Sequence, residues 1–171
     1  MADPANKDRI VQQLIKWGTG REDLSAMLWT SSRTNPAVPV DLFSDYDIIL
    51  VVEDINPYYE NESWLEDFGR DLVLYRDPLH LESGCQCFAE ITQYEDGLKI
   101  DFGVWPIGLL RKIAADPVLP DFLDIGFRVI LDKDGLAVGL RTPYYRAFIS
   151  SPPAEIFFQE TIEEFSIRRL M

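Results

Sequence analysis

Hydrophobic and polar positions alternate along this chain with two different periods, and these predict a mixture of helices and strands. Between residues 8 and 17 the apolar residues recur with the spacing of one helix face, and Gly18 and Gly20 follow, so we expect an amphipathic helix. Further helices are expected at 64–68, 107–115 and 154–170. Apolar runs bounded by turn residues predict strands at 24–30, 46–52, 71–76, 86–94, 98–105 and 127–131.

Two of these segments decide the fold class. The run 46–52 is almost entirely apolar, which is typical of a strand buried on both faces. Asp96-Gly97 lies between two strand-like runs, which predicts a tight antiparallel turn. Because a hairpin then interrupts the mixed order of helices and strands, we expect an α+β fold, a mixed sheet flanked by helices, over a doubly wound parallel sheet.

Size and composition set the domain organisation. With 171 residues and 47% hydrophobic content, we expect one compact domain over 1–151, followed by a terminal amphipathic helix over 152–171. No apolar run approaches the roughly 20 residues of a membrane span. The N-terminal segment lacks the apolar core of a signal peptide. We therefore expect a cytoplasmic protein without a membrane partner.

The formal net charge of −13 argues against a nucleic acid as the main partner. Two interpretations of this charge stay open, namely solubility and the attraction of a polycationic small molecule. The spacing of Cys85 and Cys87 suits neither a disulfide nor a zinc site, so we expect reduced, structural cysteines.

The candidate chemistry begins at Asp45 and Asp47, at the head of the most apolar run. Side chains two apart on a strand share one face and lie about 6.6 Å apart along it. Two carboxylates so placed on a buried strand repel each other and lose solvation, which is tolerated when a divalent cation lies between them. The preceding Ser31-Ser32 turn, taken as the opening of a helix, offers N–H groups and hydroxyls to phosphate oxygens. Together these features predict a metal–nucleotide site.

Asp101 is the third carboxylate of this set. It alternates with Ile100 and Phe102 and so lies on the opposite face of an otherwise apolar strand. A salt bridge to a Lys or Arg and a role as a third metal ligand both remain open, and the neighbouring motif favours the metal. Three convergent carboxylates suffice for two Mg²⁺ ions, with Asp101 as the candidate base for the attacking hydroxyl.

The order Ser31-Ser32, a gap of twelve residues, Asp45-Tyr46-Asp47 and a distal Asp101 resembles the polymerase-β-like nucleotidyltransferase superfamily. The pattern of that superfamily consists of Gly-Ser, a spacer, Asp-x-Asp and a later Asp. Six segments over about 24–165 are similar, in the same order, to the aminoglycoside (streptomycin) 6-adenylyltransferases. These are SSRTNP, FSDYDIILVVEDI, SWLEDFG, KIDFGVWP, ILDKDG and PPAE…EEF.

The resemblance implies a polymerase-β-like fold and transfer of AMP from ATP to a hydroxyl of a cationic aminoglycoside such as streptomycin. It implies two Mg²⁺ ions, release of pyrophosphate and a role in antibiotic resistance. Carried onto this chain, it places Asp45, Asp47 and Asp101 on the metal ions. Ser31, Ser32 and Arg33 form the nucleotide site, with Ser32 and Arg33 on the triphosphate.

This chain departs from the family pattern at two points. Ser31 stands in place of glycine, so its Cβ either crowds the triphosphate or demands a strained backbone, and we expect weakened nucleotide binding. The family continues into a C-terminal helical domain, which predicts that this chain is a shortened or stand-alone form. The apolar side of its last helix then packs on a further domain or in a homodimer. Acidic residues there line a cationic pocket or form a solvated face, namely Glu155, Glu160, Glu163 and Glu164.

Three alternatives to aminoglycoside adenylylation stay open. The first is a nucleotide-binding or interaction module that has the same fold without transfer activity. The second is a stand-alone nucleotidyltransferase with another acceptor, such as a protein or a different small alcohol. The third is a purely structural Asp-x-Asp motif, satisfied by neighbouring Arg and Lys side chains.

Overall fold

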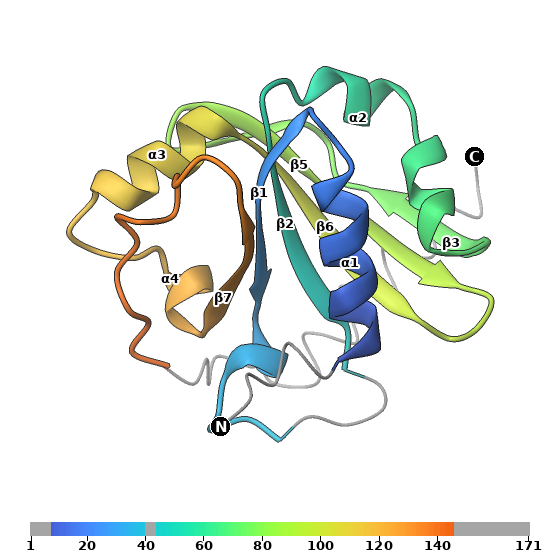
Figure 1. Ribbon diagram of the computed structural model, residues 1–171, viewed down its shortest axis with the longest axis horizontal. Coiled ribbons are helices and arrows are strands. Elements are labelled where there is room, and N and C mark those ends of the chain that lie inside the picture. Colours follow the sequence, from blue (N-terminus) through green and yellow to red (C-terminus); the bar gives the residue numbers. More distant parts are fainter. Residues whose placement is uncertain (1–7, 40–43, 146–171) are drawn as a thin grey trace, which may run out of the picture.

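A computed structural model describes residues 8–39 and 44–145 of the chain. A central sheet has helices on both faces, with α1 on one face and α3 and α4 on the other (Figure 1). The strands are β1 (Leu24–Thr30), β2 (Tyr46–Val52), β3 (Asp71–Arg76), β4 (His80–Glu82), β5 (Cys85–Tyr94), β6 (Lys99–Pro106) and β7 (Phe127–Asp132). The helices are α1 (Arg9–Thr19), α2 (Asn56–Glu60), α3 (Ile107–Ala115) and α4 (Asp121–Asp124), with 3-10 turns η2 (Ser32–Thr34) and η3 (Ser63–Phe68).

The strand order is β3-β5-β6-β2-β1-β7, and β4 pairs with β5 outside this path. β2 and β6 pair in parallel, whereas the other neighbouring pairs among the described strands are antiparallel. The α+β class and mixed sheet expected from the sequence are therefore confirmed. The parallel pair matters most for function, because it joins the two strands that carry the candidate carboxylates.

β2 is the centre of two hydrophobic cores, as its apolar run predicts. Ile48, Leu50 and Val52 pack with α1, α2 and η3 on one side of the sheet. Ile49 and Val51 pack with α3 and α4 on the other side. Burial of both faces fixes the register of β2, since a slip of one residue would bring Asp47 into the first core.

Helix α1 begins where Asp8 accepts hydrogen bonds from the backbone N–H groups of Ile10 (2.9 Å) and Val11 (3.3 Å). The helix continues through Gly18, where the sequence predicts its end. A Cβ at Gly18 would lie within 2.9 Å of side-chain carbons of Leu24, Met27 and Leu131. Gly18 therefore serves the close packing of α1 against the sheet rather than the end of the helix.

The hairpin predicted at Asp96-Gly97 joins β5 to β6, and Gly97 has the positive φ of 87° that this turn requires. Three short elements have no counterpart in the sequence prediction, namely α2, β4 and α4. The segment predicted as a helix at 64–68 is the 3-10 turn η3. The terminal helix, its glutamates and its expected contacts lie outside the described residues.

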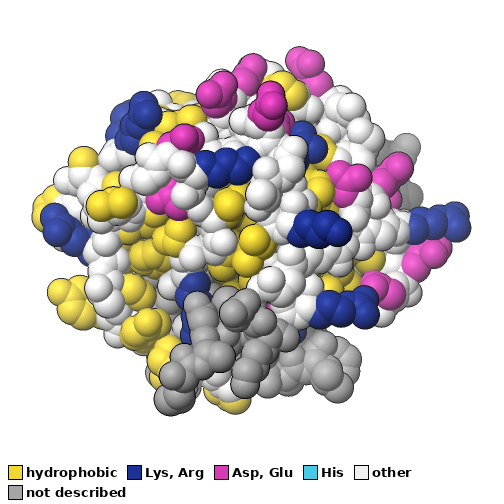
Figure 2. Space-filling view, in the orientation of Figure 1, with side chains coloured by type: hydrophobic (Ala, Val, Ile, Leu, Met, Phe, Trp, Pro, Cys, Tyr) yellow, Lys and Arg dark blue, Asp and Glu magenta, His cyan; other side chains and the backbone are white. Residues whose placement is uncertain are grey.

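Acidic side chains gather along the upper margin of the molecule near α2, while Lys and Arg side chains are scattered singly over this face (Figure 2). Within the described part of the chain, no helix combines the length and apolar character that a membrane crossing would need. Both cysteines, Cys85 and Cys87, are free thiols.

Candidate active site

A cavity of about 460 Å³ lies on the face of the sheet that carries α3 and α4. One end is formed by the end of β1 with Ser31, and by Asp47 and Asp101 on the two parallel strands. The opposite wall comes from the β3–β4 connection and β4. The cavity thus contains the candidate nucleotide turn and two of the three candidate carboxylates.

Asp47 and Asp101 are direct partners in the register of the parallel pair β2–β6. Partners on neighbouring strands, about 4.8 Å apart, point to the same face of a sheet. The alternation of β6 agrees, because Ile100 and Phe102 are fully buried in the core on the other side. The structure therefore brings together two carboxylates that are far apart in the sequence.

This proximity has an electrostatic cost. Burial, and then the charges of Asp47 and Asp45, raise the pKa of Asp101 to about 7. Burial also raises the pKa of Asp47, while a hydrogen bond from the Ser31 hydroxyl opposes that rise. Nearby positive charge is therefore insufficient to stabilise both carboxylates in their ionised form at neutral pH.

Asp45 lies just before β2 and is not part of the cavity wall. Its Oδ1 atom is 3.7 Å from Nζ of Lys99, a pairing of the kind that a purely structural Asp-x-Asp motif would have. Asp45 Oδ1 and Asp101 Oδ1 are enclosed and have no hydrogen-bond donor among the described residues. Within residues 8–39 and 44–145, no three His, Cys, Asp or Glu side chains are arranged to hold one ion. The arrangement is a facing pair with a third carboxylate beside it, rather than a closed metal cage.

These oxygen donors still suit Mg²⁺ chemically. Mg²⁺ prefers oxygen ligands and keeps several waters and substrate phosphates in its shell, so it needs few protein ligands. Two enclosed carboxylate oxygens without hydrogen-bond donors are the kind of group that such an ion satisfies.

Ser31 has φ of 71° and ψ of −154°, a backbone region that is essentially restricted to glycine. The strained backbone expected from Ser in place of Gly is therefore present. The conformation is held by a hydrogen bond from Ser31 N to Gly126 O (3.0 Å), and by Thr34, whose N (3.0 Å) and Oγ1 (2.8 Å) donate to Ser31 O.

The turn that follows Ser31 differs from the expected helix start. η2 covers only Ser32–Thr34, a single 3-10 turn. It is too short to develop the aligned dipoles of a helix N-terminus. Any phosphate contact at Ser32 must then come from local N–H and hydroxyl groups.

The Arg33 side chain points to the backbone ahead of β2. Nε donates to Ser44 O (3.1 Å) and Asp45 O (3.0 Å), and Nη2 donates to Ser44 O (2.6 Å). The guanidinium also lies over the ring of Tyr46, 4.1 Å from its centroid. The triphosphate contact expected of Arg33 stays a prediction, and these contacts suggest a different role.

Sequence reasoning missed the far wall of the cavity. Asp77, His80 and Glu82 line it, and the thiol of Cys87 lies 3.3 Å from Nε2 of His80. β4 has only three residues, too few for a periodic signal, so the sequence pattern does not place these groups. With Asp47 and Asp101 the lining contains four carboxylates, and it contains no Lys or Arg from the described residues.

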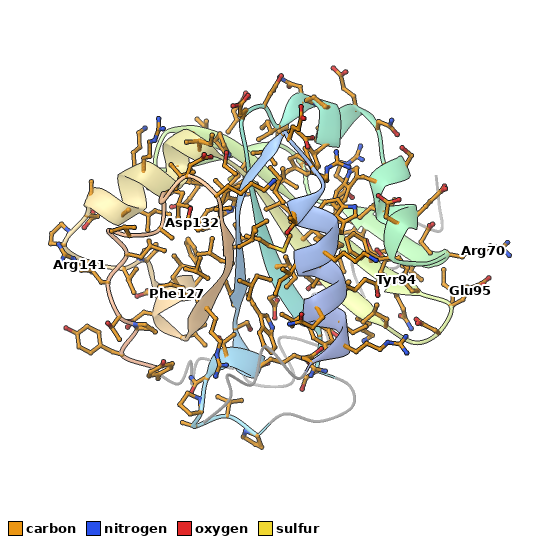
Figure 3. All side chains as sticks on the ribbon, viewed as in Figure 1. Arg70, Tyr94, Glu95, Phe127, Asp132 and Arg141 are labelled. Atoms are coloured by element: carbon orange, nitrogen blue, oxygen red, sulfur yellow. The ribbon has the colours of Figure 1, made fainter. Side chains whose placement is uncertain are left out.

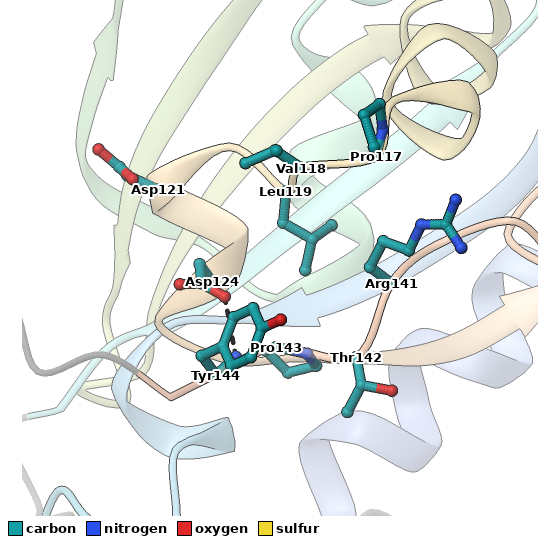
Figure 4. Close-up of a pocket in the computed structure, with 9 residues that line it drawn as sticks. All are labelled: Pro117, Val118, Leu119, Asp121, Asp124, Arg141, Thr142, Pro143 and Tyr144. Carbon is teal, nitrogen blue, oxygen red and sulfur yellow. Dashed lines mark hydrogen bonds between the residues drawn. The ribbon is translucent and has the colours of Figure 1, made fainter.

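A second hollow, of about 550 Å³, lies between the α3–α4 connection and residues 141–144 (Figure 4). Asp124 accepts a hydrogen bond there from Tyr144 N (2.8 Å), and Asp121 and Arg141 line other parts of it. It does not include the facing carboxylates or the Ser31 turn. We therefore assign the candidate site to the first cavity.

Comparison with known proteins adds independent evidence. The family model described as streptomycin adenylyltransferase matches residues 5–169. An aminoglycoside 6-adenylyltransferase from Bacillus subtilis (strain 168) is 33% identical over 164 residues, which cover 94% of this chain and 55% of that protein. One from Staphylococcus aureus is 27% identical, covering 91% and 54%, and one from Campylobacter jejuni is 28% identical, covering 78% and 45%. The chain thus spans about half the length of the curated relatives it matches.

Among solved structures, a crystal structure of an aminoglycoside 6-adenyltransferase from Bacillus subtilis aligns with 57% of this chain and 34% of its own. The sequence identity is 25% and the TM-score is 0.44.

The strain at Ser31 predicts an inverted order of stability. Glycine normally destabilises a position relative to alanine by about 0.5–1 kcal/mol. At position 31 we expect Ser31→Gly to be more stable than Ser31→Ala by about 1–2 kcal/mol, because only alanine retains the strained Cβ. Urea unfolding of both variants checks this, with the same pair of substitutions at Ser32 as the control. Alanine more stable than glycine at both positions would contradict the strain.

The raised pKa of Asp101 predicts that its carboxylate destabilises the metal-free protein as the pH rises. The folded-state pKa, about 7, exceeds the ordinary value of 3.8, so the folded state binds more protons between these limits. Stability contributed by Asp101 is therefore lost between about pH 4 and pH 7. Thermal and urea unfolding in a chelating buffer should show Asp101→Asn to be more stable by roughly 2–4 kcal/mol above pH 7. The difference in the free energy of unfolding between Asp101→Asn and wild type should disappear toward pH 4.

Asp96→Asn, at the exposed hairpin turn, is the matched control and should show no such trend with pH. A constant difference between wild type and Asp101→Asn across the range would mean that Asp101 ionises without cost.

Proposed function

Because this chain belongs to the streptomycin adenylyltransferase family, we propose that it transfers AMP from ATP to a hydroxyl group of an aminoglycoside such as streptomycin, releasing pyrophosphate. Family membership confirms the resemblance noted in the six sequence segments. The activity itself is an inference from the family and from the site.

The observation that carries the proposal is the facing of Asp47 and Asp101 across the parallel strand pair. These two carboxylates border a cavity that also contains the Ser31 turn. A nucleotide placed along that turn would bring its phosphates to the carboxylates. This is the arrangement that phosphoryl and nucleotidyl transfer requires, because positioning and charge neutralisation supply most of the catalysis.

We propose that Asp47, Asp101 and Asp45 hold Mg²⁺. When bound, the ions neutralise phosphate charge and orient the reacting groups. Asp45 would give up its long ion pair with Lys99 on binding. Asp101 borders the cavity beside Asp47, so we propose it as the group that accepts the proton of the acceptor hydroxyl. A bound cation would lower its pKa from the metal-free value of about 7 and keep the carboxylate ionised.

The electrostatics of the cavity support a cationic acceptor. Asp77 and Glu82 line the same cavity from the β3–β4 connection and β4, which lies beside β5 and not beside the Ser31 turn at the end of β1. Trp105, on the same strand as Asp101, adds an aromatic side chain to the lining. We propose that ammonium or guanidinium groups of the acceptor contact Asp77 and Glu82.

A second candidate is a nucleotide-binding module without transfer activity, and the strained Ser31 favours it. A Cβ at the position where the motif has glycine narrows the approach of a triphosphate. Calorimetry separates the two functions. Binding of Mg·ATP without pyrophosphate release in the presence of any aminoglycoside would favour the module.

Removal of one carboxylate of the facing pair should abolish turnover. We expect Asp47→Asn to lower the rate of pyrophosphate release in the presence of ATP, Mg²⁺ and streptomycin by about 100-fold or more. The substitution keeps the size of the side chain and removes the negative charge that would bind the metal ion. Asp96→Asn should retain the wild-type rate. A wild-type rate in Asp47→Asn would exclude Asp47 from the reaction.

The acidic wall predicts an effect confined to the acceptor. Asp77→Asn and Glu82→Gln should each raise the KM for streptomycin about tenfold, equivalent to about 1.4 kcal/mol, through loss of one charged contact. The KM for ATP should stay within about twofold, and the increase should shrink at high salt. Glu53→Gln, an exposed position just after β2, serves as the control. Equal changes in both KM values would point to a general disturbance of the site.

A further inference from the structure

Arg33 connects two segments that both belong to the candidate site. It belongs to the η2 turn next to Ser31 and Ser32, and its three hydrogen bonds reach the carbonyl groups of Ser44 and Asp45. The first segment carries the candidate phosphate groups. The second leads into the strand that carries Asp47.

The backbone at Ser44 and Asp45 lies beyond the last residues of β2 that pair with β1. The pairing of β1 with β2 stops at Thr30 opposite Asp47, where the Thr30 hydroxyl donates to Asp47 O (3.3 Å). Beyond that point the chain turns away at Ser31. The guanidinium group donates to the carbonyls of Ser44 and Asp45, just ahead of the paired part of β2. A planar group with several fixed donors is suited to bind two successive carbonyls.

An aromatic ring also holds the same guanidinium group. It lies over the Tyr46 ring, and the Tyr46 hydroxyl donates to Asp8 Oδ2 (2.8 Å). The other oxygen of Asp8 caps helix α1. A continuous set of contacts thus runs from the start of α1 through Tyr46 to Arg33.

We propose that Arg33 is a positioning residue, which fixes the distance between the Ser31-Ser32 turn and the carboxylates of Asp45 and Asp47. It acts through the backbone of Ser44 and Asp45 and need not touch the nucleotide. The contact between the Ser31 hydroxyl and Asp47 depends on this spacing. The expected loss of kcat rests on the proposed function, whereas the expected change in amide exchange does not.

The rival role is a direct contact with the triphosphate. Lysine also binds phosphate, as a point charge without the bidentate geometry of arginine, so it keeps a large part of such a contact. Lysine cannot form three hydrogen bonds to two successive carbonyls in this planar geometry. Arg33→Lys therefore separates the two roles, and Arg33→Met removes the charge as well.

The experiment compares Arg33→Lys, Arg33→Met and Arg70→Lys. Arg70 lies at the far end of the sheet beside Glu95, with its side chain 82% exposed, and provides the matched control (Figure 3). Amide hydrogen exchange by mass spectrometry on peptides covering 44–52 reports how firmly this segment is held, and it needs no enzymatic activity. Steady-state kinetics with ATP and streptomycin report kcat and KM separately.

For a positioning role, both Arg33 variants exchange about tenfold faster over 44–52, and kcat falls about tenfold in both, which corresponds to about 1.4 kcal/mol. The KM for ATP stays within about twofold, and Arg70→Lys matches wild type. For a phosphate contact, amide exchange is unchanged in both Arg33 variants, and the KM for ATP rises, more in Arg33→Met than in Arg33→Lys. That result would overturn the proposal.

Two further outcomes are decisive. If the wild type shows no turnover, the proposed function fails. Faster exchange over 44–52 in the Arg33 variants still supports the positioning role, and unchanged exchange overturns it.

If the Arg33 variants do not fold, Tyr46→Phe replaces them, since it keeps the ring under the guanidinium and removes only the hydrogen bond to Asp8. A two- to threefold rise in exchange over 44–52 then supports the role, and no change overturns it.

Discussion

Repulsion between two partly dehydrated carboxylates is the constraint that shapes this site. The parallel register of β2 and β6 holds Asp47 and Asp101 side by side, and burial raises the pKa of both. The described lining of the cavity provides no Lys or Arg to balance them. Among the described residues, the rise is opposed by the Ser31 hydroxyl and the charge of Arg33 at Asp47, and by the charge of Lys99 at Asp101. A fold that keeps such a pair is less stable for it, and a bound cation would offset the repulsion.

Ser31 adds a second, local strain at the same place. Its backbone adopts a conformation that glycine takes at little cost, and surrounding hydrogen bonds from Thr34 and to Gly126 hold it there. Its hydroxyl, however, binds Asp47, a contact that glycine cannot make. Serine at this position therefore costs backbone strain, and its hydroxyl partly stabilises the charge of Asp47. The two strains are coupled, because both involve the same few atoms at the ends of β1 and β2.

The regular part of the fold could be predicted because long periodic segments dominate it. The buried strand β2, the Asp96-Gly97 hairpin and the amphipathic α1 each have a local signature, and the structure contains all three. The facing of Asp47 and Asp101 was expected from the motif, although their register depends on distant pairing. Short elements such as β4 lack a periodic signal, so Asp77 and Glu82 were missed. The contacts of Arg33 were also missed, because a side chain that binds backbone carbonyls leaves no trace in sequence spacing.

The parallel pairing of β2 with β6 also has a consequence for the order of events during synthesis. β2 leaves the ribosome well before β6, and β3, β4 and β5 must be made between them. Non-local parallel pairing is intrinsically slow to form. The emerging chain therefore carries Asp47 without its neighbour, and folds the first strands free of the repulsion. The acidic pair is created only when the β5–β6 hairpin docks on β2, and α3, α4 and β7, which cover that face and complete the other edge of the sheet, are made after it.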